Sequence, residues 1–500
     1  MLNEIHIREV KKEEIAKVLT IKDEVRFNTY SKFLTNLKKE DILYKDSYIV
    51  REEDIWEKIN QKNTYIYIAV VSDEIAGYIK FSIKDNTAEL QDLFVLDKFQ
   101  GKGIDSLLMD KMTKLLESND DLYLTKIHVL KDNENAINFY IKHGFNVDKG
   151  RIFNYRIGST KRAPTIIMYK VTGNTPDKFL QSARLILKNL IESKIPIIEL
   201  DPSSNNYIAS INGNYVYSKG ILTPLNTLSA ASLANDKLMS KKALKLFNIP
   251  TPSYLCYGKN ALDNLKEIEK ELETFINKHK RIIAKPQNGL KSKDVFLNIT
   301  NTEEALNALK HILNKDYKGA LFEVFIQGDV HRLLFVKGQL IAALRREKGF
   351  IIADGVSTIE TLIMNKNKYL DHGGRNVGRI NLDPKLEKTL SDQGYNTLSL
   401  IPDKGSKIYT EIDFSNLETV TEVTEYVNKD LAAKLGDFAL KVGLGLTGVD
   451  VISTDISDQE NSSVIEINKE PSIDFHHYPD FGNPINVAKM IADAIIEKYS

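Results

Sequence analysis

A chain of 500 residues is longer than one hydrophobic core usually serves, so two or three domains are expected. Its 68 lysines and arginines balance 68 aspartates and glutamates, and this neutral total argues against nucleic acid or an acidic membrane as a partner. The single cysteine, Cys256, excludes an internal disulfide, and no window holds the roughly 20 apolar residues of a membrane helix. Because no basic and apolar leader opens the chain, we expect a soluble cytoplasmic protein.

The first third of the chain predicts alternating strands and helices. Runs of β-branched and aromatic residues, bounded by turn residues, predict the following strands: Ile5–Val10, Tyr65–Val71, Ala76–Ile83, Ala88–Leu96 and Leu122–Val129. Helices are expected over Lys12–Asp23 and Ile104–Leu116, and a third opens at Asn133 and stops at a glycine. A polar segment that runs to Asn63 separates the first helix from the second strand.

A glycine-containing loop precedes the helix at Ile104. The sequence Phe99-Gln-Gly-Lys-Gly-Ile places two glycines and a lysine between a strand and this helix. Free backbone N–H groups at a helix start can bind a phosphate, and glycine lets the backbone approach it closely. The loop is therefore a candidate anion site.

At this loop and at the helix from Asn133 to Phe145, residues 3–171 resemble the GNAT superfamily of acetyl-CoA-dependent N-acetyltransferases. The resemblance implies that acetyl-CoA lies between two splayed strands. It assigns cofactor binding to the loop and to the later helix, at Gln100, Gly101, Gly103 and Asn133.

Two catalytic candidates follow for this part of the chain. The resemblance implies that Tyr140 is the acid that protonates the departing thiolate, although an aromatic residue at this helical spacing can equally be core. Glu89 is our candidate general base, with a structural bystander as the alternative. Asp105 stands where the family carries glycine or alanine, so its carboxylate would repel a pyrophosphate or cap the helix start itself.

A short polar link, Thr172–Asp177, predicts a boundary, and apolar periodicity restarts at Phe179. We expect a helix over Phe179–Ser193, a strand over Pro196–Leu200 and a hairpin turn at Asn212-Gly213. The predicted domains are residues 1–171, a linker and lead-in lobe over 172–235, and residues 236–500.

A second hairpin, Gly448–Pro471, presents only oxygen donors. Glu466 and Asn468 share one face of a strand, and Asp450 can join them from the neighbouring strand. Two carboxylates and an amide oxygen suit magnesium rather than zinc, although a solvated acidic turn would look the same. His476 and His477 follow, and either line a substrate site or lie on the polar surface.

Over residues 178–500 the order of motifs resembles the ATP-grasp carboxylate-amine ligases, and within them cyanophycin synthetases and the fused glutathione synthetase domain. The resemblance implies ATP held between two α+β lobes, with Lys237 and Lys285 on its phosphates and an adenine slot that begins at Glu323. It also implies magnesium on Asp450, Glu466 and Asn468.

Two further features of this region concern the substrate and the loop over the phosphates. Arg332 and Arg346 are candidates for binding the acyl phosphate or substrate carboxylates, because a planar guanidinium is a bidentate donor. Ser292 and Asp294 replace glycines in the loop after Lys285-Pro286, which predicts a stiffer phosphate lid with an extra negative charge.

The sequence thus predicts α/β and α+β architecture, a GNAT fold followed by an ATP-grasp fold. We expect ATP, magnesium and acetyl-CoA as cofactors and small amino acids or N-acyl amino acids as substrates. Either the first lobe acetylates an amine before ligation, or it only recognises substrate or senses acetyl-CoA. Formation of a homo-oligomer is left open.

Overall fold

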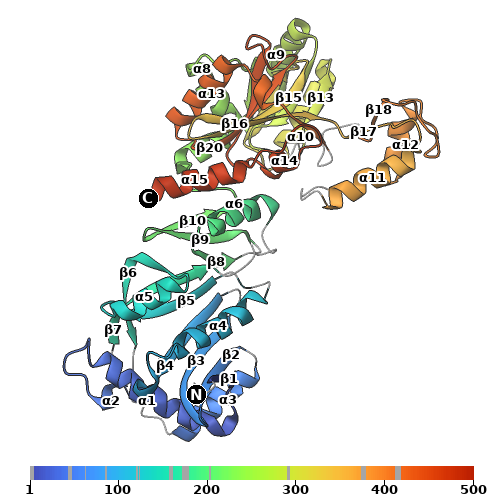
Figure 1. Cartoon of the computed structure of the whole chain (residues 1–500). Coiled ribbons are helices and arrows are strands. Elements are labelled where there is room, and N and C mark those ends of the chain that lie inside the picture. Colours follow the sequence, from blue (N-terminus) through green and yellow to red (C-terminus); the bar gives the residue numbers. More distant parts are fainter. Residues whose placement is uncertain are drawn as a thin grey trace. The chain divides into compact units, whose positions relative to one another are not determined.

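The computed structural model describes residues 5–42, 48–61, 63–84, 87–119, 122, 124–156, 162–171, 180–201, 204–289, 293–372, 379–411 and 418–500 (Figure 1). The chain divides into two compact units. The first comprises residues 1–180, 187–219 and 499–500, and the second comprises residues 181–186 and 220–498. The link predicted at Thr172–Asp177 lies outside the described residues.

The first unit is built on one large sheet whose described strands run in the order β1-β2-β3-β4-β5-β7-β6. Neighbours are antiparallel except for the parallel pair β4 and β5. The strands are β1 (Ile5–Glu9), β2 (Thr64–Val71), β3 (Glu74–Lys84), β4 (Thr87–Val95), β5 (Leu124–Leu130), β6 (Asn146–Arg156) and β7 (Arg162–Val171).

Helices cover both faces of this sheet. On one face, α4 (Ile104–Glu117) and α5 (Glu134–Lys142) bury Leu108, Met112 and Tyr140 against Phe81 and Met168. On the other face, α1 (Ile15–Tyr30) and α3 (Tyr48–Asn60) form a second core, which includes Val18, Ile68 and Tyr78. The sheet therefore separates two apolar layers.

The helical content of the first unit exceeds the sequence prediction. The predicted helix Lys12–Asp23 is a short 3-10 helix, η1 (Lys12–Glu14), followed by α1, which continues to Tyr30. The polar segment before Asn63 contains α2 (Lys39–Ile42) and α3, whose Ile55, Trp56 and Ile59 pack on the second core. Helical spacing of these few apolar residues is enough to bury one face of an otherwise charged segment.

A small sheet of order β10-β9-β8 follows, from β8 (Ile197–Asp201), β9 (Asn206–Ile211) and β10 (Asn214–Lys219). The predicted Asn-Gly turn is confirmed, because Asn212 and Gly213 join β9 to β10 with φ values of 46° and 86°. The predicted helix at Phe179–Ser193 is α6 (Gln181–Glu192).

The second unit contains two larger sheets. The first has the order β11-β14-β12-β13 and consists of β11 (Tyr254–Gly258), β12 (Ile282–Pro286), β13 (Phe296–Ile299) and β14 (Gly319–Val324). The helices α9 (Leu265–His279) and α10 (Thr302–Leu313) share its core. The second has the order β19-β16-β15-β20-β21 and consists of β15 (Asp329–Val336), β16 (Gln339–Glu347), β19 (Thr419–Glu422), β20 (Leu446–Ser453) and β21 (Ser462–Asn468).

Helices α7 (Leu228–Ala234), α8 (Lys237–Leu246) and α13 (Lys429–Val442) pack on the five-stranded sheet. A separate small core joins β17 (Phe350–Ile352) and β18 (Lys407–Tyr409) to α11 (Ile359–His372) and α12 (Pro384–Ser391). The remaining elements are α14 (Asp474–His477), α15 (Val487–Tyr499) and the 3-10 helices η2 (Asp97–Phe99), η4 (Lys259–Asn264) and η5 (Thr424–Tyr426). Among the residues that the structure describes, no helix is both long and apolar enough to cross a membrane.

Candidate functional site

The strands β4 and β5 separate partway along their length. In the described residues their parallel ladder covers only Thr87–Leu90 and Leu124–Ile127. At the same place β4 carries a β-bulge, because Leu90 pairs with Phe81 and Asp92 pairs with Lys80 while Gln91 has no partner position on β3. The chain therefore has the pair of splayed strands that the sequence resemblance implied.

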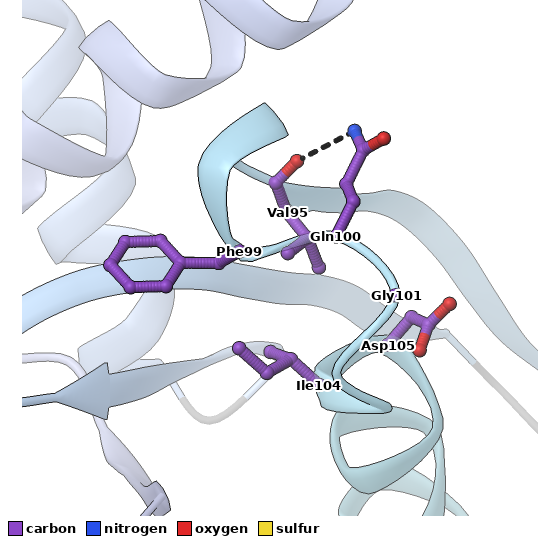
Figure 2. A pocket seen from close by; sticks show the side chains of 6 residues that line it. All are labelled: Val95, Phe99, Gln100, Gly101, Ile104 and Asp105. Atoms are coloured by element: carbon purple, nitrogen blue, oxygen red, sulfur yellow. Dashed lines mark hydrogen bonds between the residues drawn. The ribbon is translucent and has the colours of Figure 1, made fainter. Parts of the chain in front are cut away.

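The predicted phosphate loop lines a cavity of about 220 Å³ at the start of α4 (Figure 2). Gly101 and Gly103 both have φ of +75°, a conformation that side-chain-bearing residues rarely adopt. The Gln100 side chain is engaged within the loop, since its amide donates to the Val95 carbonyl at 3.2 Å and to the Asp97 carboxylate at 2.9 Å. Backbone groups are thus the part of this loop best placed to contact a ligand.

Asp105 lines the same cavity (Figure 2) and bonds to the first turn of α4. Its carboxylate accepts the backbone N–H of Ser106 at 2.9 Å. One of the free N–H groups that a phosphate would use is therefore already bonded to a negative charge.

Asn133 and Tyr140 have structural partners at the predicted helix. The Asn133 side chain caps α5 by accepting the Ala136 N–H at 3.2 Å. Tyr140 is 7 % exposed and lies between the rings of Phe139 and Phe145. Burial raises the pKa of Tyr140 well above its ordinary value, so its hydroxyl remains protonated, as a general acid requires.

In the second unit, charged residues form a row across three neighbouring strands. Arg332 on β15 pairs with Asp450 on β20, and Asp450 pairs with Glu466 on β21. The Arg332 guanidinium binds Asp450 through both Nε and Nη2, the second contact being 2.9 Å, and Asn468 Nδ2 lies 3.3 Å from the same carboxylate. The predicted set Asp450, Glu466 and Asn468 thus occupies adjacent positions of one hairpin.

Asp450 stays ionised although it is almost fully buried. Burial alone would raise the pKa of Asp450, but Arg332 and Arg346 outweigh it and hold that pKa below its ordinary value. Arg346 Nη1 lies 3.6 Å from Asp450, and its fork binds Glu418 at 2.6 and 2.8 Å. In this structure both candidate substrate arginines are engaged with carboxylates of the protein.

The donor chemistry of the hairpin fits magnesium. Asp450, Glu466 and Asn468 supply hard oxygen donors from two adjacent strands. In the described part of the chain, no group of three or more histidine, cysteine or acidic side chains is arranged to hold a metal, so this candidate set depends on Asn468 as its third donor.

Lysines from the four-stranded lobe and from α8 converge on this hairpin. Lys237 Nζ lies 2.9 Å from Glu466 and donates to the Gly289 carbonyl at 2.7 Å. Lys285 Nζ lies 2.8 Å from the fully buried Glu323 and 3.5 Å from the Ile465 carbonyl. The predicted nucleotide residues and the predicted metal strand are therefore in contact.

Lys241 is a member of this cluster that the sequence analysis did not single out. It is 2 % exposed, lies 3.2 Å from Glu323 and donates to Thr251 at 2.8 Å. Burial lowers the pKa of Lys241 to about 8. Its sequence signal is the four-residue spacing from Lys237, which places both lysines on one face of a helix. Two lysines around one buried carboxylate leave a positive excess that suits an anion.

Two expectations for neighbouring segments need correction. Asp294 is not a free charge on the phosphate loop, because it bonds to His311 at 2.9 Å and Tyr317 at 2.6 Å and also contacts Lys315. Ser292 lies outside the described residues.

The sequence left open whether His476 and His477 lie on the polar surface, and for His476 this alternative is wrong. His476 is fully buried with neither ring nitrogen hydrogen-bonded, and burial lowers its pKa to about 3. His477 Nε2 accepts the Ala488 N–H at 3.1 Å.

Comparison with known proteins agrees with the two halves of this description. The model of the acetyltransferase (GNAT) family matches residues 33–145. The chain is 28 % identical over 276 residues to a cyanophycin synthetase of Synechocystis sp., covering 53 % of this chain and 30 % of that protein. It is 27 % identical over 329 residues to the glutathione biosynthesis bifunctional protein of Clostridium perfringens, covering 63 % of this chain and 41 % of that protein.

A crystal structure of a bifunctional glutathione synthetase from Pasteurella multocida shares the fold, with a TM-score of 0.51 and 18 % identity over 64 % of this chain and 44 % of that one. The chain joins a GNAT fold to an ATP-grasp fold. The fold prediction is thereby confirmed. The chain matches less than half the length of each of these relatives, so the shared region is a part of each of them.

The cluster around Glu323 predicts a large stability effect. Glu323→Gln should lower the free energy of unfolding by about 3–5 kcal/mol, because it leaves two buried ammonium groups without a carboxylate. Scanning calorimetry of the full chain measures the effect. Lys241→Met is the matched control, since it keeps the pair of Glu323 and Lys285 and should cost less than half as much. Equal losses would contradict this electrostatic account.

The cap at Asp105 predicts that its removal strengthens acetyl-CoA binding. Asp105→Ala removes a charge near the two phosphates and frees the Ser106 N–H, which should be worth about 1 kcal/mol, or about fivefold in affinity. Titration calorimetry tests this, with Asp110→Ala, an exposed acid farther along α4, as the control. An unchanged affinity for Asp105→Ala would place its carboxylate away from the bound phosphates.

Proposed function

We propose that this chain is an ATP-dependent ligase that joins a carboxylate to an amine through an acyl phosphate, with release of ADP. The observation that carries the proposal is the contact of the oxygen-donor hairpin of Asp450, Glu466 and Asn468 with two lysines, Lys237 at the start of α8 and Lys285 on the four-stranded lobe. The similarity to cyanophycin synthetase and to the glutathione biosynthesis protein supports the same class of reaction.

Each group of side chains has a proposed role in this reaction. Lys237, Lys241 and Lys285 hold the polyphosphate of ATP. Lys241 and Lys285 outnumber the single carboxylate of Glu323 between them, and Lys237, which contacts Glu466, is the third ammonium group of the cluster. Asp450, Glu466 and Asn468 hold magnesium, which when bound neutralises phosphate charge.

Arg332 and Arg346 bind the substrate carboxylate and then the acyl phosphate, after exchanging a protein carboxylate for a substrate one. The amine then attacks the acyl carbon and phosphate leaves. Positioning and charge neutralisation are the main contributions of the protein.

We further propose that the GNAT domain acetylates an amino group of the substrate, with Tyr140 as the proton donor to the thiolate. The product would be an N-acetylated dipeptide such as N-acetylglutaminylglutamine. Acetylation would block the amine of the residue whose carboxylate is activated. The activated acid could then not react with the amine of a second identical molecule. Asp105 favours a second candidate, a first lobe that only recognises substrate without acetyl transfer, because its carboxylate already occupies a helix-start N–H that the cofactor would use.

The ligase proposal is tested by the products of the purified full chain with ATP, magnesium, acetyl-CoA and mixed amino acids. ADP and phosphate should form only when a carboxylate substrate and an amine are both present, because a sheltered acyl phosphate is not lost to water. Mass spectrometry identifies the amide. AMP and pyrophosphate as the main products would indicate adenylate chemistry and refute the proposal.

The magnesium residues predict a selective loss of turnover. Asn468→Ala should raise the magnesium concentration needed for half-maximal ADP release by about tenfold, as expected for the loss of one supporting contact. Glu466→Gln should abolish turnover with little change in melting temperature, because Glu466 is 34 % exposed. Asn461→Ala in the turn of the same hairpin is the control. Wild-type turnover in both site variants at limiting magnesium would mean that the hairpin is a solvated turn and does not bind magnesium.

A further inference from the structure

His128 is placed at the point where β4 and β5 stop pairing. The last pair of their parallel ladder is Leu90 with Ile127, and His128 is the next residue on β5. It shares a strand face with Lys126, two residues earlier, and Lys126 Nζ lies 3.1 Å from Glu89 on β4. The position of His128 in β5 is therefore at the opening between the splayed strands, two residues beyond an ion pair that is itself partly exposed.

Side chains from β6 and β7 hold the ring in a half-open aromatic site. The Tyr155 ring stacks on His128 with centroids 4.3 Å apart, and Phe153 meets it edge-on at 5.7 Å. Thr165 Oγ1 lies 3.5 Å from Nδ1. His128 is half-buried while Tyr155 is 40 % exposed, so the ring is fixed by its neighbours yet remains reachable.

The neighbouring hydroxyl indicates which ring nitrogen carries the proton. The Thr165 hydroxyl has two acceptors within reach, the Phe153 carbonyl at 3.3 Å and His128 Nδ1 at 3.5 Å, and we assign its proton to the shorter contact. In this arrangement Nδ1 carries the ring proton and Nε2 keeps a lone pair, for which no hydrogen-bond partner is present among the described residues. Burial lowers the pKa of His128, and Glu89 opposes this only in part, so the ring is neutral near pH 7.

We propose that His128 is the general base of the acetyltransferase site and that its Nε2 takes the proton from the acceptor amine. The amine nitrogen bonds to the acetyl carbon, the carbon–sulfur bond breaks, and the thiolate takes a proton, for which Tyr140 is the candidate donor. The sum is amine plus acetyl-CoA giving amide plus coenzyme A. The inference rests on the proposed acetyl transfer.

Glu89, the acid chosen from the sequence, suits binding better than proton transfer. Its carboxylate already pairs with Lys126, whereas a neutral imidazole is the better proton acceptor near pH 7. Two opposite charges side by side complement an acceptor with both an ammonium and a carboxylate group. The acceptor class for this site is therefore a free α-amino acid.

The test is the rate of free-thiol release by the full chain with acetyl-CoA and L-glutamine. His128→Gln should lower kcat by about 10²- to 10³-fold, the usual range for loss of a general base, with unchanged acetyl-CoA affinity by calorimetry. Glu89→Gln should raise KM for glutamine more than it lowers kcat. His6→Gln, the same substitution at an exposed position on β1, should match wild type.

A second variant separates chemistry from packing. His128→Ala should regain rate when imidazole is added, in proportion to its concentration, because a free base can occupy the vacated space. A rate for His128→Gln within threefold of wild type would overturn the inference, as would a loss in His128→Ala that imidazole does not restore. If wild type releases no thiol with glutamine or any other amino acid, the proposed acetyl transfer itself fails. Thiol release by His128→Gln within threefold of the wild-type rate contradicts the base assignment alone and leaves the proposed acetyl transfer standing.

Discussion

The charge on Asp450 is the constraint on which the second unit depends most. This carboxylate is almost completely removed from water, and an isolated buried charge of this kind would cost several kcal/mol. The order of the strands offsets that free-energy cost, because β15 places Arg332 beside Asp450 and β16 places Arg346 3.6 Å from it. On the other side, β21 places Glu466 and Asn468. The proposed cation-binding edge and the proposed anion-binding edge thus share one carboxylate, as the proposed transfer of a phosphoryl group from ATP to a substrate acid would require.

Glu323 is a second buried carboxylate that depends on neighbouring cations, but here the cations are in excess. Here two lysines surround one buried acid, so the local charge is positive before any ligand binds. This excess positive charge is offset when an anion binds. The stability of this lobe and its affinity for a polyphosphate are therefore expected to be coupled, with the ligand supplying the missing negative charge.

Both candidate sites lie beside a β-bulge. In β21, Ile465 is the extra residue, which lets Val464 and Ile467 both face the core while Glu466 pairs with Asp450. In β4, Gln91 is the extra residue, so Leu90 faces α4 whereas Asp92 pairs with Lys80. A bulge shifts the alternation of a strand by one position, and it bends the strand away from its neighbour. In the first unit this shift coincides with the end of the ladder between β4 and β5, where His128 lies.

Local pattern in the sequence determined the elements and the oxygen-donor hairpin. Alternation gave most strands of the first unit within a few residues, the Asn212-Gly213 turn followed from backbone preference, and the order of motifs indicated both folds. Helix α3 was missed because its apolar stripe is narrow within a charged segment. Long-range contacts were beyond the sequence because they depend on which strands become neighbours. Only the tertiary structure placed Lys241 beside Glu323, bound Arg332 to Asp450, joined Asp294 to His311 of α10 and set His128 at the end of the ladder between β4 and β5. All four depend on how distant segments pack together. For Arg332 and His128 the order of the strands decides the neighbours, which no local pattern in the sequence reveals.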